Sequence, residues 1–218
     1  MEWIPAPRAT MENDVTPSAV LDYTEVQTYL RLDGTDDQTL VENLISAVTD
    51  KVENFIGKKL ITQVWSVYYD FFPRKLKEDA WWDGSRDGAI SELYYPIQFL
   101  RLPFGPCQSL YFFNTYDSTD GTVLFDASSY TLDNISGNPK VALRNGFSWP
   151  TTMLRPLNGI HIKATFGYGT KSQVPNQIKE AIKIGVANLY EHRGDIEPES
   201  SLPNTAQMLL QSFKRWKV

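Results

Sequence analysis

Apolar residues recur at steps of three and four along residues 40–56, which is the spacing that places them on one face of an α-helix. They are Leu40, Val41, Leu44, Ile45, Val48, Val52, Phe55 and Ile56. Thr35 and Gln38 have the spacing of a capping box, and Gly57 tolerates the left-handed conformation that often ends a helix. The pattern predicts one long helix over residues 36–56, around which the rest of the chain is organised.

Three further segments have helical spacing. A short helix is predicted over residues 25–32, where Thr24 and Gln27 have the spacing of a second capping box. Another begins at Pro175, because a proline in the first turn lacks only an amide that would have no helical partner. Its apolar stripe is Ile178, Ala181, Ile182, Val186, Leu189 and Tyr190. A last helix is predicted over residues 205–216.

Between these helical segments the period of the apolar residues changes to two, which is typical of strands. β-Branched and aromatic residues predict a strand over residues 61–72, and shorter strands follow as far as Phe166. Asp120-Gly121 and Gly137-Asn138-Pro139 are typical of turns between antiparallel neighbours. Roughly six or seven short strands predict a mostly antiparallel sandwich or small barrel.

The order of these elements predicts an α+β protein in which the N- and C-terminal helices pack as one helical bundle, with an inserted antiparallel β-sandwich or barrel-like domain. Each helical part is too small to bury a core alone, so we expect the two to pack together. The predicted parts are an extended N-terminal arm (1–17), the bundle (18–59 and 170–194), the inserted β-domain (60–169), and a linker with a C-terminal helix (195–218).

Composition narrows the class of protein. Of the 218 residues, 42% are hydrophobic and 22% are charged, which is ordinary for a globular protein. No stretch approaches the roughly 20 apolar residues of a membrane span, and the N-terminus lacks the apolar core of a signal peptide. A single cysteine excludes an internal disulfide and suits a reducing compartment. The net charge of −5 argues against a protein that grips nucleic acid through its overall field.

Candidate catalytic groups are sparse. Cys107 would need a nearby base, and neither His161 nor His192 has a sequence neighbourhood typical of a catalytic pair. The segment Gly167-Tyr168-Gly169 lacks the third glycine of a dinucleotide-binding turn, so we interpret it as a turn into the helix at Pro175. The sequence predicts no catalytic residue, no cofactor and no metal site.

Two features have both a structural and a functional interpretation. The long helix carries five acidic residues against the single base Lys51: Asp36, Asp37, Glu42, Asp50 and Glu53. They form either a solvated face with favourable charge at the helix N-terminus, or an acidic surface that repels phosphates. Trp3 and Ile4 in the arm, and Trp81 and Trp82 in a polar loop, either cover their own domain or contact another subunit.

The order of short motifs resembles the head-tail connector (adaptor) proteins of tailed phages and prophages, gene-transfer-agent relatives included. The resemblance covers residues 16–216. Its first half is carried by Leu30-Arg31-Leu32-Asp33, Asp36-Asp37 and Gly57-Lys58-Lys59-Leu60-Ile61-Thr62-Gln63. Its second half is carried by Phe71-Phe72-Pro73, Leu102-Pro103-x-x-Pro106, Trp149-Pro150, Phe166-Gly167-Tyr168-Gly169, Val174-Pro175 and Leu189-Tyr190-Glu191-His192-Arg193.

The resemblance implies a structural, non-enzymatic protein of the virion neck that is assembled in the host cytoplasm. Such proteins form a ring homo-oligomer, usually a dodecamer, which joins the portal protein to a stopper or tail-completion protein while genomic DNA passes through. A stopper or tail-completion protein of the same neck, a DNA-binding module outside the virion and an enzyme remain as alternatives.

Three groups of residues are the candidates for these contacts. A bore that lets DNA pass should not bind phosphates, so we expect Asp36, Asp37, Glu42, Asp50 and Glu53 to line it. The expected portal-docking residues are Leu210, Phe213, Lys214, Arg215 and Trp216. The expected inter-subunit residues are Trp3, Ile4, Trp81 and Trp82.

Overall fold

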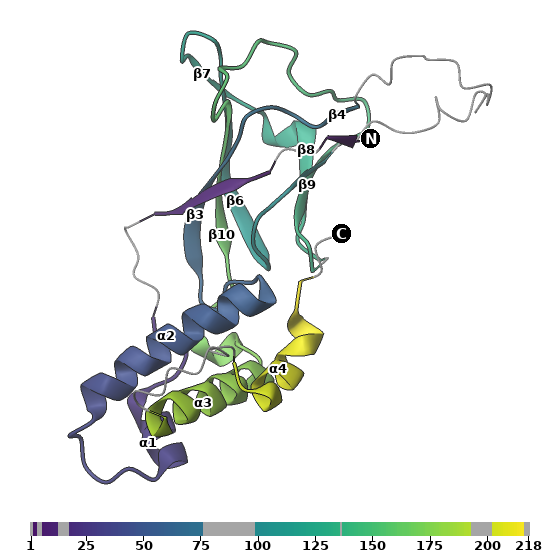
Figure 1. Ribbon diagram of the computed structural model, residues 1–218. Coiled ribbons are helices and arrows are strands. Elements are labelled where there is room, and N and C mark those ends of the chain that lie inside the picture. The colour runs from purple at the N-terminus through teal and green to yellow at the C-terminus, as the bar shows by residue number, and fades with distance from the viewer. Residues whose placement is uncertain are drawn as a thin grey trace, which may run out of the picture. The chain divides into compact units, whose positions relative to one another are not determined.

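The chain divides into two compact units, each built from segments that lie far apart in the sequence (Figure 1). The computed structural model describes residues 2–3, 6–12, 18–75, 99–135, 137–192 and 202–215. The sheet unit comprises Met1–Met11, Trp65–Pro103 and Ser109–Thr165, and the helical unit comprises Glu12–Val64, Phe104–Gln108 and Phe166–Val218. Glu2–Trp3 and Arg8–Met11, which lie in the predicted N-terminal arm, form strands of the sheet unit.

The strands form three sheets within the described residues. The largest has the order β2 (Arg8–Met11), β3 (Gln63–Tyr69), β10 (Ile160–Phe166), β6 (Cys107–Tyr116) and β7 (Thr122–Leu124). A second contains β5 (Phe99–Arg101), β9 (Lys140–Leu143) and β8 (Tyr130–Asp133), and a third pairs β1 (Glu2–Trp3) with β4 (Arg74–Lys75). The largest sheet is open, with β2 and β7 at its edges, so the barrel-like alternative is wrong for the described part of the chain.

Both predicted hairpin turns are confirmed. Tyr116 pairs with Thr122 across the Asp120-Gly121 turn, where Asp120 takes a φ of 62°. Asp133 of β8 pairs with Lys140 of β9 across the second turn. The residue types of both turns therefore set the antiparallel register of the strands that they join.

The core of the sheet unit follows the predicted alternation of apolar and polar positions. In β10, Ile160, Ile162 and Ala164 are fully buried, while His161 and Lys163 between them are half-buried. Aromatic rings fill the space between the two larger sheets: the ring centroid of Phe113 in β6 lies 5.5 Å from that of Tyr130 in β8. This core needs residues from both sheets, because neither sheet alone has a partner for its apolar face.

The helical unit contains α1 (Tyr23–Leu30), α2 (Gln38–Ile56), α3 (Asn176–Glu191) and α4 (Asn204–Leu210). In Figure 1, α2 lies along α3, and α4 also packs against α3. The predicted stripe of α2 is confirmed at Val41, Ile45, Val48, Val52 and Ile56, all of which are buried. The prediction is wrong at Leu40, which is 36% exposed.

A glycine in α3 allows α2 to approach closely. A Cβ atom at Gly185 would lie 2.7 Å from Cγ1 of Val48, which is too close for two carbon atoms. The lack of a side chain at Gly185 thus determines how closely the two helices pack, although glycine normally destabilises a helix interior.

The helix ends show where local capping signals mislead. α2 begins at Gln38, whose side-chain amide donates to Glu42 (2.8 Å) instead of reaching back to Thr35, so the predicted capping box is wrong. α1 begins at Tyr23, earlier than predicted, because Glu25 accepts a hydrogen bond from the backbone N–H of Asp22 (2.9 Å). The predicted left-handed end of α2 at Gly57 is confirmed, with a φ of 69°.

Gly167-Tyr168-Gly169 is a backbone contact rather than a phosphate-binding turn. The N–H of Tyr168 donates to the carbonyl of Leu60 (3.0 Å), and the N–H of Thr62 donates to the carbonyl of Gly169 (3.0 Å). A Cβ atom at Gly167 would lie 2.4 Å from the carbonyl oxygen of Ile61. The glycine is therefore needed because two backbone segments lie side by side with no room for a side chain.

Candidate functional site

The exposed face of α2 consists mostly of short, uncharged side chains. Its exposed residues include Thr39, Asn43, Ser46, Ala47 and Asn54. Glu42 and Asp50 add negative charge to this face, and Lys51 is its single cation. We call this the polar face of α2. It presents little positive charge to a phosphate, because it contains no arginine and one lysine.

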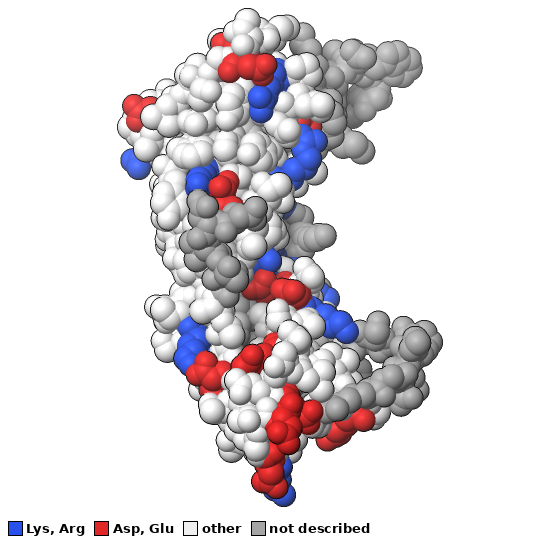
Figure 2. Space-filling view, turned by 90° about the vertical axis from the view of Figure 1, so that its left-hand side faces the viewer, with Lys and Arg blue, Asp and Glu red and all other residues white. Residues whose placement is uncertain are grey.

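Acidic residues are concentrated in the first two helices and in the segments that flank them. Residues 22–56 contain eight acidic and two basic residues, and the resulting charge of −6 exceeds the chain's net charge of −5. Figure 2 shows Asp and Glu side chains gathered over part of the helical unit, whereas acidic and basic side chains are mixed over the sheet unit on this side. Of the expected bore residues, Asp36, Glu42 and Asp50 are exposed, whereas Asp37 is half-buried and accepts a hydrogen bond from the hydroxyl of Tyr190.

Glu53, the fifth expected bore residue, does not reach the surface. Its side chain is 5% exposed and accepts hydrogen bonds from the backbone N–H of Leu60 (2.9 Å) and the side-chain amide of Gln63 (3.4 Å). The ammonium group of Lys59 lies 2.7 Å from the same carboxylate. The prediction that Glu53 lines a bore is wrong, because this carboxylate instead fixes the chain that turns back after α2.

The C-terminal segment places cations beside the last turn of α2. The backbone N–H of Arg215 donates to the carbonyl of Ile56 (2.8 Å), and the ammonium of Lys214 lies 4.7 Å from the ring centroid of Phe55. Burial and the positive charge of Arg215 both lower the pKa of Lys58. We call Lys58, Lys214 and Arg215 the basic end of the helical unit. Positive charge at this position is favoured by the helix dipole, whose negative end lies here.

The expected portal-docking residues divide into buried and accessible ones. Leu210 is fully buried in the core formed by α2, α3 and α4, so it is wrong as a docking residue. Phe213 packs against the same core and is half-buried. Lys214 and Arg215 are also half-buried, and Trp216 lies outside the described residues. The C-terminal helix is thus part of the helical unit and does not form a separate docking arm.

Only one of the expected inter-subunit residues falls in the described part of the chain. Trp3 lies in β1, where it pairs with Arg74 of β4 in an antiparallel register. Ile4, Trp81 and Trp82 lie outside the described residues. The role of all four in contacts between subunits therefore stays a prediction.

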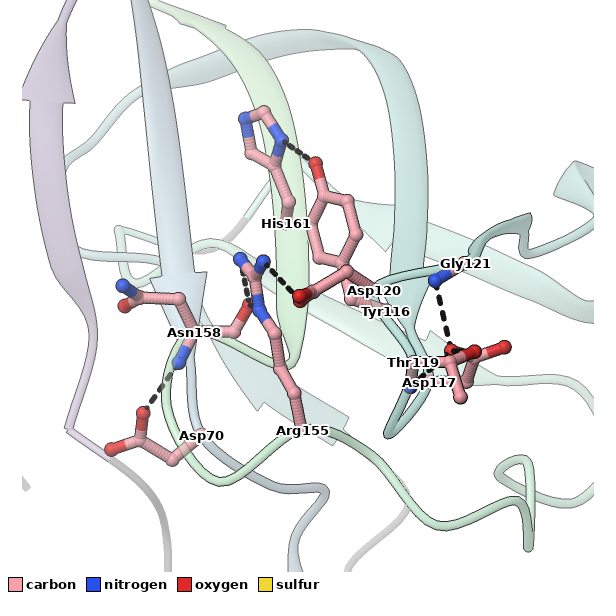
Figure 3. A network of polar contacts seen from close by, with 9 residues as sticks. All are labelled: Asp70, Tyr116, Asp117, Thr119, Asp120, Gly121, Arg155, Asn158 and His161. Atoms are coloured by element: carbon pink, nitrogen blue, oxygen red, sulfur yellow. Dashed lines mark hydrogen bonds and ion pairs between the residues drawn. The ribbon is translucent and has the colours of Figure 1, made fainter.

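A polar and aromatic network in the sheet unit has no signal in the sequence beyond the alternation at His161 (Figure 3). Nδ1 of His161 lies 3.2 Å from the hydroxyl of Tyr116, and its Nε2 lies 2.8 Å from the hydroxyl of Ser66. The guanidinium of Arg155 lies 4.0 Å from the ring centroid of Tyr116 and donates to Asp120 (3.2 Å). The network joins β3, β6 and β10 to the segment that carries Arg155.

Two carboxylates near this network are held by hydrogen bonds. The pKa of Asp117 is lowered by the hydroxyl of Thr119 and by the backbone N–H groups of Thr119 and Gly121. Burial alone would raise the pKa of Asp70, but hydrogen bonds from Asn158 and Arg8 outweigh it and the pKa is lowered. In its ionised form Asp117 stabilises a turn, whereas Asp70 joins the residue after β3 to Arg8 and Asn158. Neither forms part of a catalytic arrangement in the described residues.

The described residues give little support to a catalytic cysteine, a metal site or a membrane-spanning helix. Cys107 is buried, with 2% of its surface exposed. No group of three or more His, Cys, Asp or Glu side chains in the described residues could hold a metal ion. Among the helices described, none has the length and apolar character needed to cross a membrane.

Comparisons with solved structures find the same fold in chains of gene transfer agent particles. A chain from the neck of an empty gene transfer agent (GTA) particle, computed with C6 symmetry, is similar with a TM-score of 0.71 and 17% identity, covering 97% of each chain. A chain from the virion of a native GTA particle gives 0.70 and 17% over 96% of each chain. A chain from the neck of a native GTA particle, computed with C12 symmetry, gives 0.68 and 17% over 97% of each chain.

Sequence comparison supplies an independent match over a shorter range. A search of curated proteins finds no match to the chain. Residues 22–80, however, match the family described as "Phage gp6-like head-tail connector protein". This range includes α1, α2 and β3, and therefore the polar face of α2 and all of the acidic residues between positions 22 and 56. Over residues 22–80 the chain is thus similar to the phage gp6-like head-tail connector family, and the family resemblance predicted from the sequence is confirmed.

Proposed function

We propose that this chain is a structural protein of the virion neck, in which copies form a dodecameric ring between the portal protein and a stopper or tail-completion protein. The observation that carries the proposal is the match of the fold to neck chains over nearly its whole length. The match of residues 22–80 to a head-tail connector family supports it independently. A dodecamer is compatible with both symmetries used for the similar necks, because a twelve-fold ring also has six-fold symmetry. Assembly in the host cytoplasm belongs to the same proposal.

The polar face of α2 is the surface that suits a bore. Short hydroxyl and amide side chains are neutral, and Glu42 and Asp50 repel phosphates, so DNA moving past this face would release few counterions and would bind weakly. Asp36 is exposed and remains a candidate for the same lining. Asp37 is a weaker candidate, because Tyr190 already uses its carboxylate.

Docking to the portal is proposed for the part of the C-terminal segment that follows the buried core. Phe213, Lys214 and Arg215 retain accessible surface. Trp216, which lies outside the described residues, stays a predicted portal-docking residue. The proposal excludes Leu210, whose side chain is buried.

Imaging of the purified particle tests the assignment. We expect cryo-electron microscopy to show density that fits this fold as a ring at the head-tail junction, directly below the portal. A position farther from the portal would favour a stopper or tail-completion protein. Absence of the fold from the neck, in particles whose proteins are all assigned, would overturn the proposal.

A further inference from the structure

The turn between α1 and α2 is a fixed acidic surface at one end of the helical unit. Residues 31–37 contain Asp33, Asp36 and Asp37 against the single cation Arg31, and we call them the acidic turn. Asp33 and Asp36 are exposed. The hydroxyl of Tyr23 and the side-chain amide of Gln27 both donate to the carbonyl of Gly34 at 2.9 Å, which holds the turn in one conformation. The carboxylates are therefore presented on an ordered backbone and need little ordering on binding.

The basic end is equally fixed and lies at the other end of α2. Lys58 follows the left-handed residue Gly57, and Arg215 is tied to the last turn of α2 by its backbone hydrogen bond to Ile56. A Cβ atom at Gly57 would lie 3.3 Å from Cβ of Arg215, so the C-terminal segment packs directly on the helix end. α2 has 19 residues, which at about 1.5 Å per residue separates the acidic turn from the basic end by about 28 Å.

A head-to-tail ring requires two different surfaces on each subunit that complement each other. The acidic turn and the basic end have opposite charge, lie on one rigid element and are too far apart to neutralise each other within a chain. Acidic groups at the helix N-terminus and basic groups at its C-terminus also leave each end stable in the free subunit.

We propose that the acidic turn of one copy docks on the basic end of the next copy, with Asp33 and Asp36 facing Lys58, Lys214 and Arg215. This inference rests on the proposed ring and adds to it the contact that closes the ring. It assigns Lys214 and Arg215 to that contact, and leaves Phe213 and Trp216 as the portal-docking candidates. The occupant is a second copy of this chain, because the chain itself carries the complementary surface. The polar face of α2 lies between the two ends and remains available to the bore.

Charge reversal with mixing tests the contact. One variant carries Asp33→Lys and Asp36→Lys, and a second carries Lys58→Glu and Lys214→Glu, which leaves the backbone anchor of Arg215 intact. Asp50→Lys serves as the control, since it makes the same kind of change on α2 outside both surfaces. Thermal unfolding confirms that each variant is folded, and the milder pair Asp33→Asn with Asp36→Asn replaces the first variant if it is not.

Sedimentation velocity and native mass spectrometry at low salt provide the readout. We expect the wild-type chain and Asp50→Lys to form species larger than a dimer that dissociate as salt is added. Each reversed variant alone should associate at least about tenfold more weakly, because like charges then meet. An equimolar mixture of the two should restore assembly, with the variants alternating in even-numbered complexes.

Three results would contradict the proposed contact between the acidic turn and the basic end. They are a wild-type chain that stays monomeric at low salt, an assembly that stops at a dimer, and reversed variants that assemble as well as the control. Variants that assemble normally but no longer bind the portal would assign the basic end to portal docking instead. None of these results would remove the chain from the neck, which the particle image tests separately.

Discussion

At the scale of single residues, the carboxylate of Glu53 determines how the chain leaves α2. Glu53→Ala would leave the buried N–H of Leu60 without its acceptor and would remove the partner of Lys59. Removing one member of a buried pair costs about 3–5 kcal/mol, so we expect the free energy of unfolding to fall by about 3 kcal/mol or more. Urea denaturation followed by tryptophan fluorescence measures the change.

Glu42→Ala is the matched control for Glu53→Ala, because it removes an exposed carboxylate from the same helix. We expect it to change the free energy of unfolding by less than about 0.5 kcal/mol. Equal effects of the two substitutions would contradict the structural role of Glu53.

A second prediction at the residue scale concerns Gly167. Its φ of 125° and its close approach to the carbonyl of Ile61 both exclude a side chain. We expect Gly167→Ala to lower the free energy of unfolding by about 3 kcal/mol or more, since backbone strain and a backbone clash add. Gly137→Ala is the comparison, because no other atom lies within 4 Å of the place that its new methyl group would occupy. Differential scanning fluorimetry that gave both variants the same Tm would contradict this explanation.

The residue scale is also where the sequence is least informative. Glu53 belongs to a run of acids that looks like a solvated helix face, and the groups that bury it follow only after the chain has turned at Gly57. Thr35 and Asp37 are both good capping residues, so residue type alone cannot select the first residue of α2. Arg155 has no periodic context, and its contact with Tyr116 depends on the folded sheet unit.

At the scale of elements, the C-terminal helix is part of the core. Leu202, Ala206 and Leu210 are buried with α2 and α3, so α4 completes the helical unit. We expect Leu210→Ala to lower the free energy of unfolding by about 2–5 kcal/mol, because it leaves a cavity in that core. Deletion of residues 203–218 should unfold the helical unit, because it removes these buried side chains from the core.

Met208→Ala is the control for Leu210→Ala, since Met208 lies in the same helix and is 79% exposed. Chemical denaturation should find it within about 0.5 kcal/mol of the wild-type chain. A deletion variant that kept a cooperative unfolding transition with unchanged Tm would show that α4 does not stabilise the helical unit.

Elements were predictable wherever a period extends over several turns or strands. The stripe of α2 and the alternation in β10 each repeat often enough to define the buried face before any partner is known. The stripe of α4 was equally visible, but periodicity does not say which surface an apolar face covers. Leu210 therefore had the right character for either a core or a docking site, and only the contacts with α3 decide between them.

At the scale of the whole molecule, charge is separated along α2: acidic in the turn before its first residue, mostly uncharged along its exposed face, and basic just beyond its last residue. In the proposed ring, this distribution would let one helix make two kinds of contact: a charged one with neighbouring copies and a mostly uncharged one with passing DNA. Association of the acidic turn with the basic end should weaken as salt is added. The polar face of α2 should bind DNA weakly at any salt concentration.

The proposal that the polar face of α2 lines the path of the DNA can be tested by adding a positive charge to that face. Asp50→Lys places a cation on the polar face of α2, and we expect the assembled ring to bind duplex DNA with an affinity that falls steeply with salt, because phosphate contacts release counterions. Glu180→Lys is the control, since it makes the same charge change at an exposed position of α3. Fluorescence anisotropy with labelled DNA measures both. Equal DNA binding by the two variants, or salt-dependent binding by the wild-type ring, would show that this face does not line the path of the DNA.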